Sequence, residues 1–163
     1  SASMSRSSSD QPTRVAGPHG DGVPWVPSPP TWPYELRLAP RREVPDLLDV
    51  RCDRDGLAAA LVDGLARLDQ LFDEPMPYML WVHQRPTDGG DWPGARVHVH
   101  VCPLNRAAGV ARYVAAAEQG GGVWFDPVLP EEAAARLRAL PGMPSGSASA
   151  GGSPVSTDRA AGR

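Results

Sequence analysis

The amino-acid sequence predicts an α+β domain: an antiparallel sheet with packed helices, between two disordered tails. Two segments, 78–83 and 96–102, have the composition of strands and are separated by a loop of turn-forming residues. An earlier segment, 55–72, carries apolar residues at helical spacing. Two neighbouring strands joined by a loop, with helices before and after them, favour an antiparallel sheet over the regular alternation of a parallel one.

The chain has 163 residues, enough for one ordinary domain, but its two ends are poor in large apolar residues. Residues 1–22 are rich in Ser, Gly, Asp and Pro, and residues 141–163 in Gly, Ser, Ala and Pro. Such segments bury too little apolar surface to offset the entropy lost on ordering, so both are predicted to be disordered tails. The folded domain is therefore expected at 23–140.

The first part of this domain is expected to be extended and then helical. Five prolines in 24–35 exclude a helix, and 34–38 alternates apolar and charged residues as a short strand does. The helix 55–72 follows because one of its faces carries an apolar stripe, formed by Leu57, Leu61, Leu65, Leu68 and Phe72.

The two central strands are predicted to pair with each other. Pro75 and Pro77 favour extended backbone before 78–83, whose large apolar residues are typical of a buried strand. Residues 96–102 alternate strictly between polar and apolar side chains. The loop between the strands, 84–94, is dense in turn formers, so a hairpin-like unit is expected.

The C-terminal part of the domain is expected to hold two more helices. An Ala-rich stretch over 107–117 is predicted to be helical and to end before the glycines at 120–122. The segment 123–129 is apolar and extended. Pro130 suits the first position of a last helix, and the two glutamates after it suit the positive helix N-terminus.

Composition excludes several classes of protein. The formal net charge of −3 implies no strong field toward nucleic acid or a membrane surface. No run of 18 apolar residues suggests a membrane span, and no apolar stretch near the N-terminus suggests a signal peptide. Two cysteines, Cys52 and Cys102, make no disulfide framework. A reduced, cytoplasmic protein is expected.

Three of the four histidines fall on the two central strands. His83 ends the first strand, and His98 and His100 are two residues apart on the second. Residues i and i+2 of a strand face the same side, so two imidazoles can converge on one ion, with His83 as a third ligand. Imidazole nitrogen is a preferred zinc ligand, so these histidines are predicted to bind one metal ion. A metal-free catalytic histidine face, or no role, are the alternatives.

The remaining histidine and one cysteine are weaker candidates for this site. Cys102 shares the strand face of His98 and His100 and could supply a fourth ligand, although a buried Cys beside a proline is more typical of packing. His19 lies in the low-complexity N-terminal tail and is interpreted as a solvated tail residue.

Five short motifs follow one another in the predicted domain. They are Trp32-Pro33-Tyr34-Glu35, Pro77-Tyr78 leading to His83-Gln84-Arg85-Pro86, His98-Val99-His100 followed by Pro103, Arg112 leading to Glu118, and the stretch 130–138 that begins Pro-Glu-Glu. In this order and spacing they resemble the C-terminal half of galactose-1-phosphate uridylyltransferase, a branch of the histidine-triad superfamily. The resemblance covers about residues 23–140.

The resemblance implies a nucleotidyltransferase of galactose metabolism. That family moves a uridylyl group from UDP-glucose to galactose 1-phosphate through a covalent uridylyl-histidine, which forms on a His-Pro-His motif of the N-terminal half. The family counterparts of His83, His98 and His100 hold a structural metal, zinc or iron, which a glutamate of the N-terminal half completes. The counterparts of Glu118 and Arg112 contact the hexose inside a partner subunit of a homodimer, and Asp126 lies near a further sugar-binding position.

The sequence departs from the family pattern in one decisive respect, because it contains no His-Pro-His. Pro18-His19-Gly20 lies too close to Trp32 to take that place. The chain is therefore expected to be inactive alone and to act as the C-terminal half of a transferase. A catalytically inactive module that binds metal or nucleotide-sugar is the alternative, and phosphate-ester chemistry on the face of His98 and His100 is a third.

Overall fold

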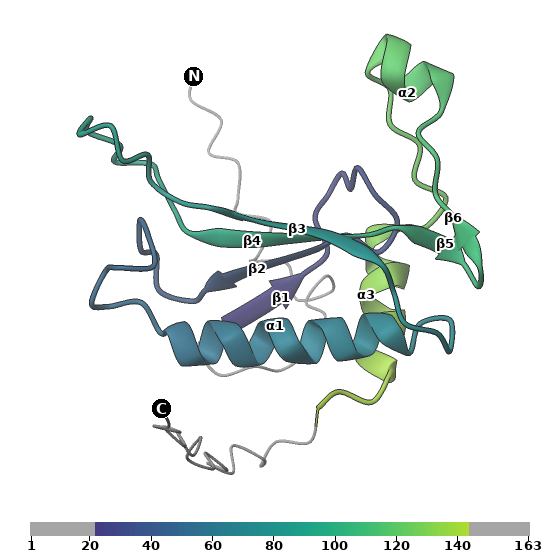
Figure 1. Cartoon of the computed structure of the whole chain (residues 1–163), viewed down its shortest axis with the longest axis horizontal. Coiled ribbons are helices and arrows are strands. Elements are labelled where there is room, and N and C mark those ends of the chain that lie inside the picture. The colour runs from purple at the N-terminus through teal and green to yellow at the C-terminus, as the bar shows by residue number, and fades with distance from the viewer. Residues whose placement is uncertain (1–21, 144–163) are drawn as a thin grey trace, which may run out of the picture.

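The computed structural model describes residues 22–143, and four of its strands form one antiparallel sheet (Figure 1). The strands lie in the order β1-β2-β4-β3, with every neighbouring pair antiparallel. This confirms the predicted fold class. The bounds of the four strands are β1 Gly22–Trp25, β2 Leu36–Pro40, β3 Tyr78–His83 and β4 His98–Pro103.

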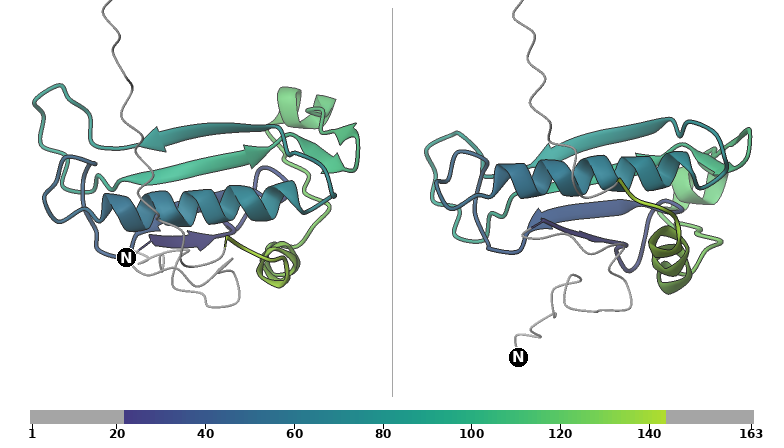
Figure 2. Two further views of the ribbon diagram at one scale, coloured as in Figure 1. Left: turned by 60° about the horizontal axis from the view of Figure 1, so that its bottom comes forward. Right: turned by 90° about the horizontal axis from the view of Figure 1, so that it is seen from below.

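Three helices and a small hairpin complete the described part of the chain. The helices are α1 Arg54–Asp69, α2 Ala116–Gly121 and α3 Pro130–Ala139, and the hairpin pairs β5 Asn105–Ala107 with β6 Val110–Ala111. Helix α1 lies along one face of the sheet. Helix α2 projects away from the sheet on an arm, which is the part of the chain between β6 and α3 (Figures 1 and 2). Within 22–143 no helix combines the length and apolar character needed to cross a membrane.

The core lies between the sheet and α1, with α3 closing one end. Asp53 caps α1 by accepting a hydrogen bond from the backbone N–H of Gly56 at 2.9 Å. Pro130 begins α3, as predicted, with acidic residues in the first turn. The buried residues of the core are Val26, Tyr34, Leu36, Leu38, Leu57, Ala60, Leu68, Leu71, Met76, Val99, Val101, Ala133, Ala134 and Leu137.

Strand β1 was not predicted, because the segment 24–35 is rich in proline, which cannot donate to a sheet ladder. The strand tolerates Pro24 because it is an edge strand, where one row of backbone groups needs no partner. Gly22 therefore belongs to a strand and not to a tail, and at the other end the N–H of Met143 donates to Asp63. The rest of the two predicted tails lies outside the described residues.

The prediction that 78–83 is a buried strand was wrong. Strand β3 pairs with β4 as expected, with His83 opposite His98, but all six of its residues are exposed. The reason is position: β3 is the other edge of the sheet, and α1 packs against β1 and β2. Its apolar side chains, from Tyr78 to Val82, are thus left uncovered.

The predicted helix over 107–117 was also wrong. Residues 105–111 form the β5–β6 hairpin, whose turn is made at Gly109 with a φ of +61°. The helix starts only at Ala116, because the side chain of Glu118 accepts a hydrogen bond from the backbone N–H of Ala115 at 2.7 Å and so caps the first turn. Gly122, in the left-handed conformation, ends the helix.

Candidate functional site

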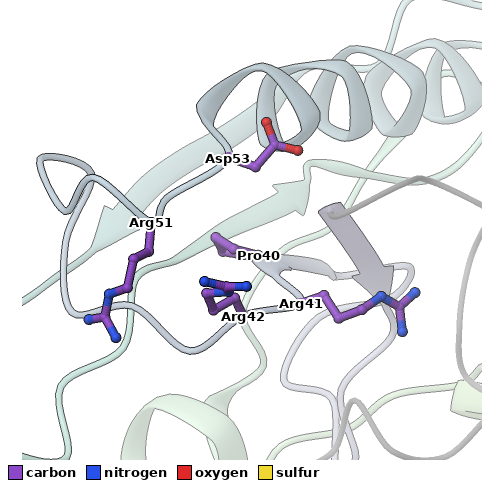
Figure 3. Close-up of a pocket in the computed structure, with 5 residues that line it drawn as sticks. All are labelled: Pro40, Arg41, Arg42, Arg51 and Asp53. Atoms are coloured by element: carbon purple, nitrogen blue, oxygen red, sulfur yellow. The ribbon is translucent and has the colours of Figure 1, made fainter.

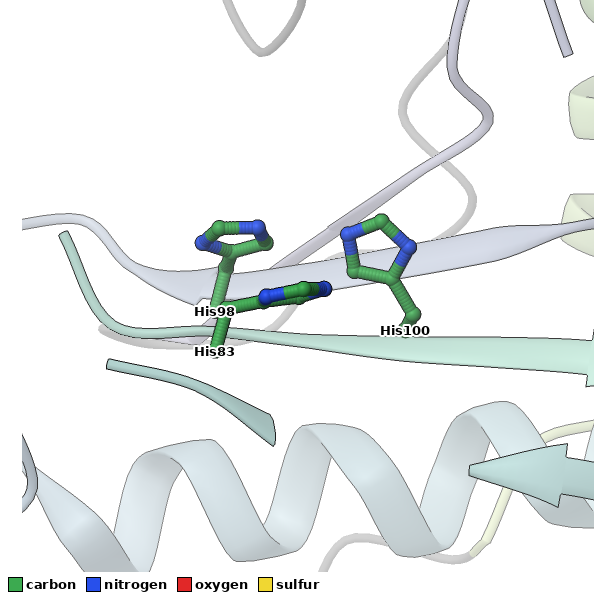
Figure 4. A group of neighbouring side chains, drawn as sticks. All are labelled: His83, His98 and His100. Atoms are coloured by element: carbon green, nitrogen blue, oxygen red, sulfur yellow. The ribbon is translucent and has the colours of Figure 1, made fainter. Parts of the chain in front are cut away.

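Strand β4 presents its valines and its histidines to opposite faces of the sheet. Val99 and Val101 belong to the core against α1, and the alternation of a strand therefore places His98 and His100 on the other face. His83 is opposite His98 in the β3–β4 register and shares that face. Figure 4 shows the three rings together above the sheet, with the helix on the other side.

The three histidines are close enough to share one ion. One ligand nitrogen from each lies within 4.8 Å of those of the other two. Burial lowers the pKa of His83 and of His98, and the neighbouring imidazoles lower both further. Both shifts favour the neutral form of His83 and His98, which is the form that binds a metal ion.

The hydrogen bonds of the two β4 histidines leave the same nitrogen free on each ring. Nδ1–H of His98 donates to the carbonyl oxygen of Arg96 at 2.8 Å, which places the lone pair of that ring on Nε2. Nε2 of His100 is buried and has no hydrogen-bond partner in the described part of the chain. A buried nitrogen without a partner is costly, and a metal ion would satisfy it, so the residues fit the predicted metal.

Trp81 lies across this cluster. Its indole ring stacks on His100 with a centroid separation of 5.1 Å, and its N–H donates to Nε2 of His83 at 2.7 Å. The hydrogen bond identifies Nε2 as the lone-pair nitrogen of His83 in this state. A metal held by this nitrogen would take the place of the indole N–H as its partner.

Cys102 lies outside the cluster. Among residues 22–143, the side chains near enough to share one ion are the three histidines, and the thiol is not one of them. Burial raises the pKa of Cys102 to about 12, which opposes the thiolate that a metal would need.

Replacing Cys102 with Ala is therefore expected to leave the zinc stoichiometry of the chain unchanged. Zinc bound after gel filtration, measured by inductively coupled plasma mass spectrometry, checks this. Loss of zinc from the folded Cys102→Ala variant would show that the thiol is a ligand after all.

A second group of predicted residues meets at a hollow of about 440 Å³ beside the α2 arm. Arg112, Glu118 and Asp126 all line it, together with Pro33, Arg106, Tyr113, Ala115, Phe125 and Pro127. The structure thus brings together the three residues predicted for sugar binding. Burial raises the pKa of Asp126, whose Oδ1 accepts a hydrogen bond from the backbone N–H of Val128.

Glu118 organises the arm around this hollow. Besides capping α2, it accepts hydrogen bonds from the N–H of Phe125 at 3.0 Å and from the guanidinium of Arg112. Arg112 is itself stacked on Trp32, with its Cζ 4.0 Å from the ring centroid, and its buried NH1 has no partner among the described residues. The guanidinium is therefore held in place with one donor group still available.

Lowering the pH is expected to loosen the arm. The backbone N–H groups of Phe125 and Ala115, with help from Arg112, hold the pKa of Glu118 below its usual range. The stability that Glu118 contributes is thus fully present above the ordinary carboxyl pKa of about 4.3 and is lost as the pH falls through the lower folded-state pKa. The NMR amide shifts of Ala115 and Phe125 should titrate together below about pH 4. Shifts that follow the same titration in Glu118→Gln would contradict this assignment.

Another hollow, lined by Pro40, Arg41, Arg42, Arg51 and Asp53, is basic (Figure 3). Two of its charged side chains already have structural partners: Arg51 pairs with Asp49, and Asp53 caps α1.

Comparison with known proteins shows the family to which the chain belongs. The family described as "Galactose-1-phosphate uridyl transferase, C-terminal domain" matches residues 20–147. The chain belongs to this family. The galactose-1-phosphate uridylyltransferase of Cryptococcus neoformans is 39% identical over 131 residues, which cover 77% of this chain and 34% of that protein.

Two further relatives of the uridylyltransferase family extend the comparison. The Thermotoga maritima enzyme is 34% identical over 109 residues, covering 66% of this chain and 34% of its own length. A solved uridylyltransferase structure has a TM-score of 0.72 and 28% identity, covering 81% of this chain and 42% of that one. The chain therefore spans about a third of the length of its curated uridylyltransferase relatives.

Sequence reasoning assigned no role to three residues that the structure places at these sites: Glu35 beside His100, Trp81 over the histidines, and Trp32 under Arg112. Glu35 and Trp32 stand in the uridylyltransferase motif at 32–35, but the contacts that bring them to these sites are with His100 and Arg112, far along the chain. The one local signal was Trp81, which lies two residues before His83 and so shares its strand face.

Proposed function

We propose that this chain is the C-terminal half of a UDP-glucose–hexose-1-phosphate uridylyltransferase and supplies a structural metal clamp and hexose contacts. One observation carries the proposal: in a chain of this family, His83, His98 and His100 share one sheet face while Arg112, Glu118 and Asp126 line one hollow. UDP-sugar and hexose 1-phosphate are the proposed substrates, and the cytoplasm the proposed location.

The three histidines would hold the metal, which we propose to be zinc, with iron as the alternative. Bound there, the ion supplies a rigid cross-link and no chemistry on the substrate. The exposed β3 edge beside His83 is where the N-terminal half of the transferase would pack, since uncovered apolar strand edges favour pairing with further chain. A carboxylate from that half would complete the ligand set.

The hollow would bind the hexose. Ionised Glu118 accepts hydrogen bonds and suits sugar hydroxyls, and the available donor group of Arg112 suits a hydroxyl or phosphate oxygen. Asp126 offers a further acceptor. The arm that carries these residues exposes Tyr113, Trp124 and Phe125. We propose that it inserts into the active site of a second copy, in a homodimer.

The uridylyl transfer itself would rely on the N-terminal half. Attack on the α-phosphorus needs a histidine with a free lone pair placed in line with the leaving group. Histidines committed to a metal do not provide one, and the sequence has no His-Pro-His. The 163-residue chain alone should therefore show no transfer.

A chimera tests the proposal. Residues 22–143 would replace the matching C-terminal part of the Thermotoga maritima enzyme, and transfer between UDP-glucose and galactose 1-phosphate would be followed by ³¹P NMR. We expect transfer by the chimera and none by the isolated chain. A Glu118→Ala chimera that binds metal normally is expected to lose most activity. A folded, metal-loaded parent chimera without transfer would contradict the proposal and favour a catalytically inactive binding module.

A further inference from the structure

The most deeply buried carboxylate near the histidines belongs to Glu35, which follows a tight turn and precedes β2. The backbone N–H of Glu35 donates to the carbonyl of Trp32 at 3.0 Å, and Tyr34 adopts a φ of +58° within the turn. Glu35 is only 1% exposed. Burying an ionised carboxylate is costly unless hydrogen bonds or charges compensate it, so its partners define what it does.

The two oxygens of Glu35 have different partners. Oε2 accepts hydrogen bonds from the backbone N–H and the hydroxyl of Thr31, at 3.2 and 3.0 Å. Oε1 accepts one from Nε of Arg37 at 3.0 Å and lies 3.5 Å from Nδ1 of His100. The backbone N–H of Thr31, which any residue at this position would supply, and the guanidinium of Arg37 thus fix the plane of the carboxylate and direct one oxygen at the imidazole.

This contact decides which nitrogen of His100 is free. A carboxylate beside Nδ1 favours the tautomer with its proton on Nδ1, and the lone pair then lies on Nε2. Nε2 is the buried nitrogen without a partner. His98 likewise carries its proton on Nδ1, which donates to a backbone carbonyl oxygen. Both β4 histidines would therefore present Nε2 to one ion.

We propose that Glu35 is a positioning residue for the metal, which orients His100 and holds it in the tautomer that ligates through Nε2. The inference rests on the proposed metal site. Carboxylates behind metal-bound histidines fix ring orientation and raise ligand basicity, and their loss typically lowers metal affinity about 10–100-fold.

The test compares zinc affinity in the full chain, by competition with a chromophoric chelator, for wild type, Glu35→Gln and Thr31→Val. We expect about a 10–100-fold loss for Glu35→Gln. Thr31→Val removes a hydrogen bond from the other carboxylate oxygen without touching His100, and should keep nearly wild-type affinity. Equal affinities in Glu35→Gln and wild type would overturn the inference, as would an equal loss in Thr31→Val.

A second measurement needs no variant and is independent of folding defects. Long-range ¹H–¹⁵N correlation spectra of the zinc-loaded wild-type chain report which nitrogen of each imidazole carries the proton. We expect His100 to carry it on Nδ1. A proton on Nε2 would overturn the role of Glu35 while leaving the metal site intact, whereas a wild-type chain that binds neither Zn²⁺ nor Co²⁺ would refute the proposed site itself.

Discussion

Replacing His100 with Ala is expected to weaken zinc binding by at least about 100-fold, because loss of a ligand should cost more than the 10–100-fold typical of losing a residue behind one. His100 is the buried member of the cluster, and its Nε2 has no other partner among the described residues. The two remaining histidines would leave the ion largely to water. Competition with a chromophoric chelator, at constant pH, measures the loss.

The matched control is His19→Ala, which removes the fourth histidine of the chain. It should bind zinc as wild type does, because His19 belongs to no strand motif. A fall in affinity of the same size in both variants would indicate weak, distributed binding to any imidazole. Retention of tight binding by His100→Ala alone would remove His100 from the ligand set.

Replacing Arg67 with Ala is expected to lower the free energy of unfolding by about 3–5 kcal/mol, as breaking a buried ion pair from one side does. Arg67 joins α1 to the end of α3. It pairs with Asp63 at 2.6 Å and donates to the carbonyl oxygens of Leu137 and Leu140 at 2.9 and 2.7 Å. Its removal takes donors away from these buried carbonyl oxygens and withdraws the cation that pairs with Asp63. Urea denaturation followed by circular dichroism measures the change.

Arg41→Ala is the matched control, because this arginine is exposed, and a shift within about 0.5 kcal/mol is expected. The double variant Asp63→Asn/Arg67→Ala separates the cost of the lost ion pair with Asp63 from the cost of the lost hydrogen bonds to the carbonyl oxygens. If the lost ion pair of Asp63 dominates the change in the free energy of unfolding, the double variant should be more stable than Arg67→Ala. A free energy of unfolding for Arg67→Ala that matches Arg41→Ala would contradict the assigned role of the cross-link.

Much of the fold was predictable because its signals are local. The apolar stripe of 55–72 gave α1 to within a few residues at each end, and Pro130 gave the start of α3. The helix predicted over 107–117 was wrong, for a reason that is also local but lies in single residues. A turn at Gly109 and a side-chain cap from Glu118 make the helix begin at Ala116. Neither feature changes the Ala-rich composition from which the helix was predicted.

The faces of β4 were determined by the sequence itself. A strand alternates with a period of two, so His98 and His100 must share one side and the valines the other, whatever packs against them. Only the tertiary structure decided that β3 is an exposed edge, that His83 lies opposite His98, and that Glu35 reaches His100. Those outcomes depend on strand order, on register and on a turn that is distant in sequence. The periodicity of apolar residues within one segment carries no information about any of them.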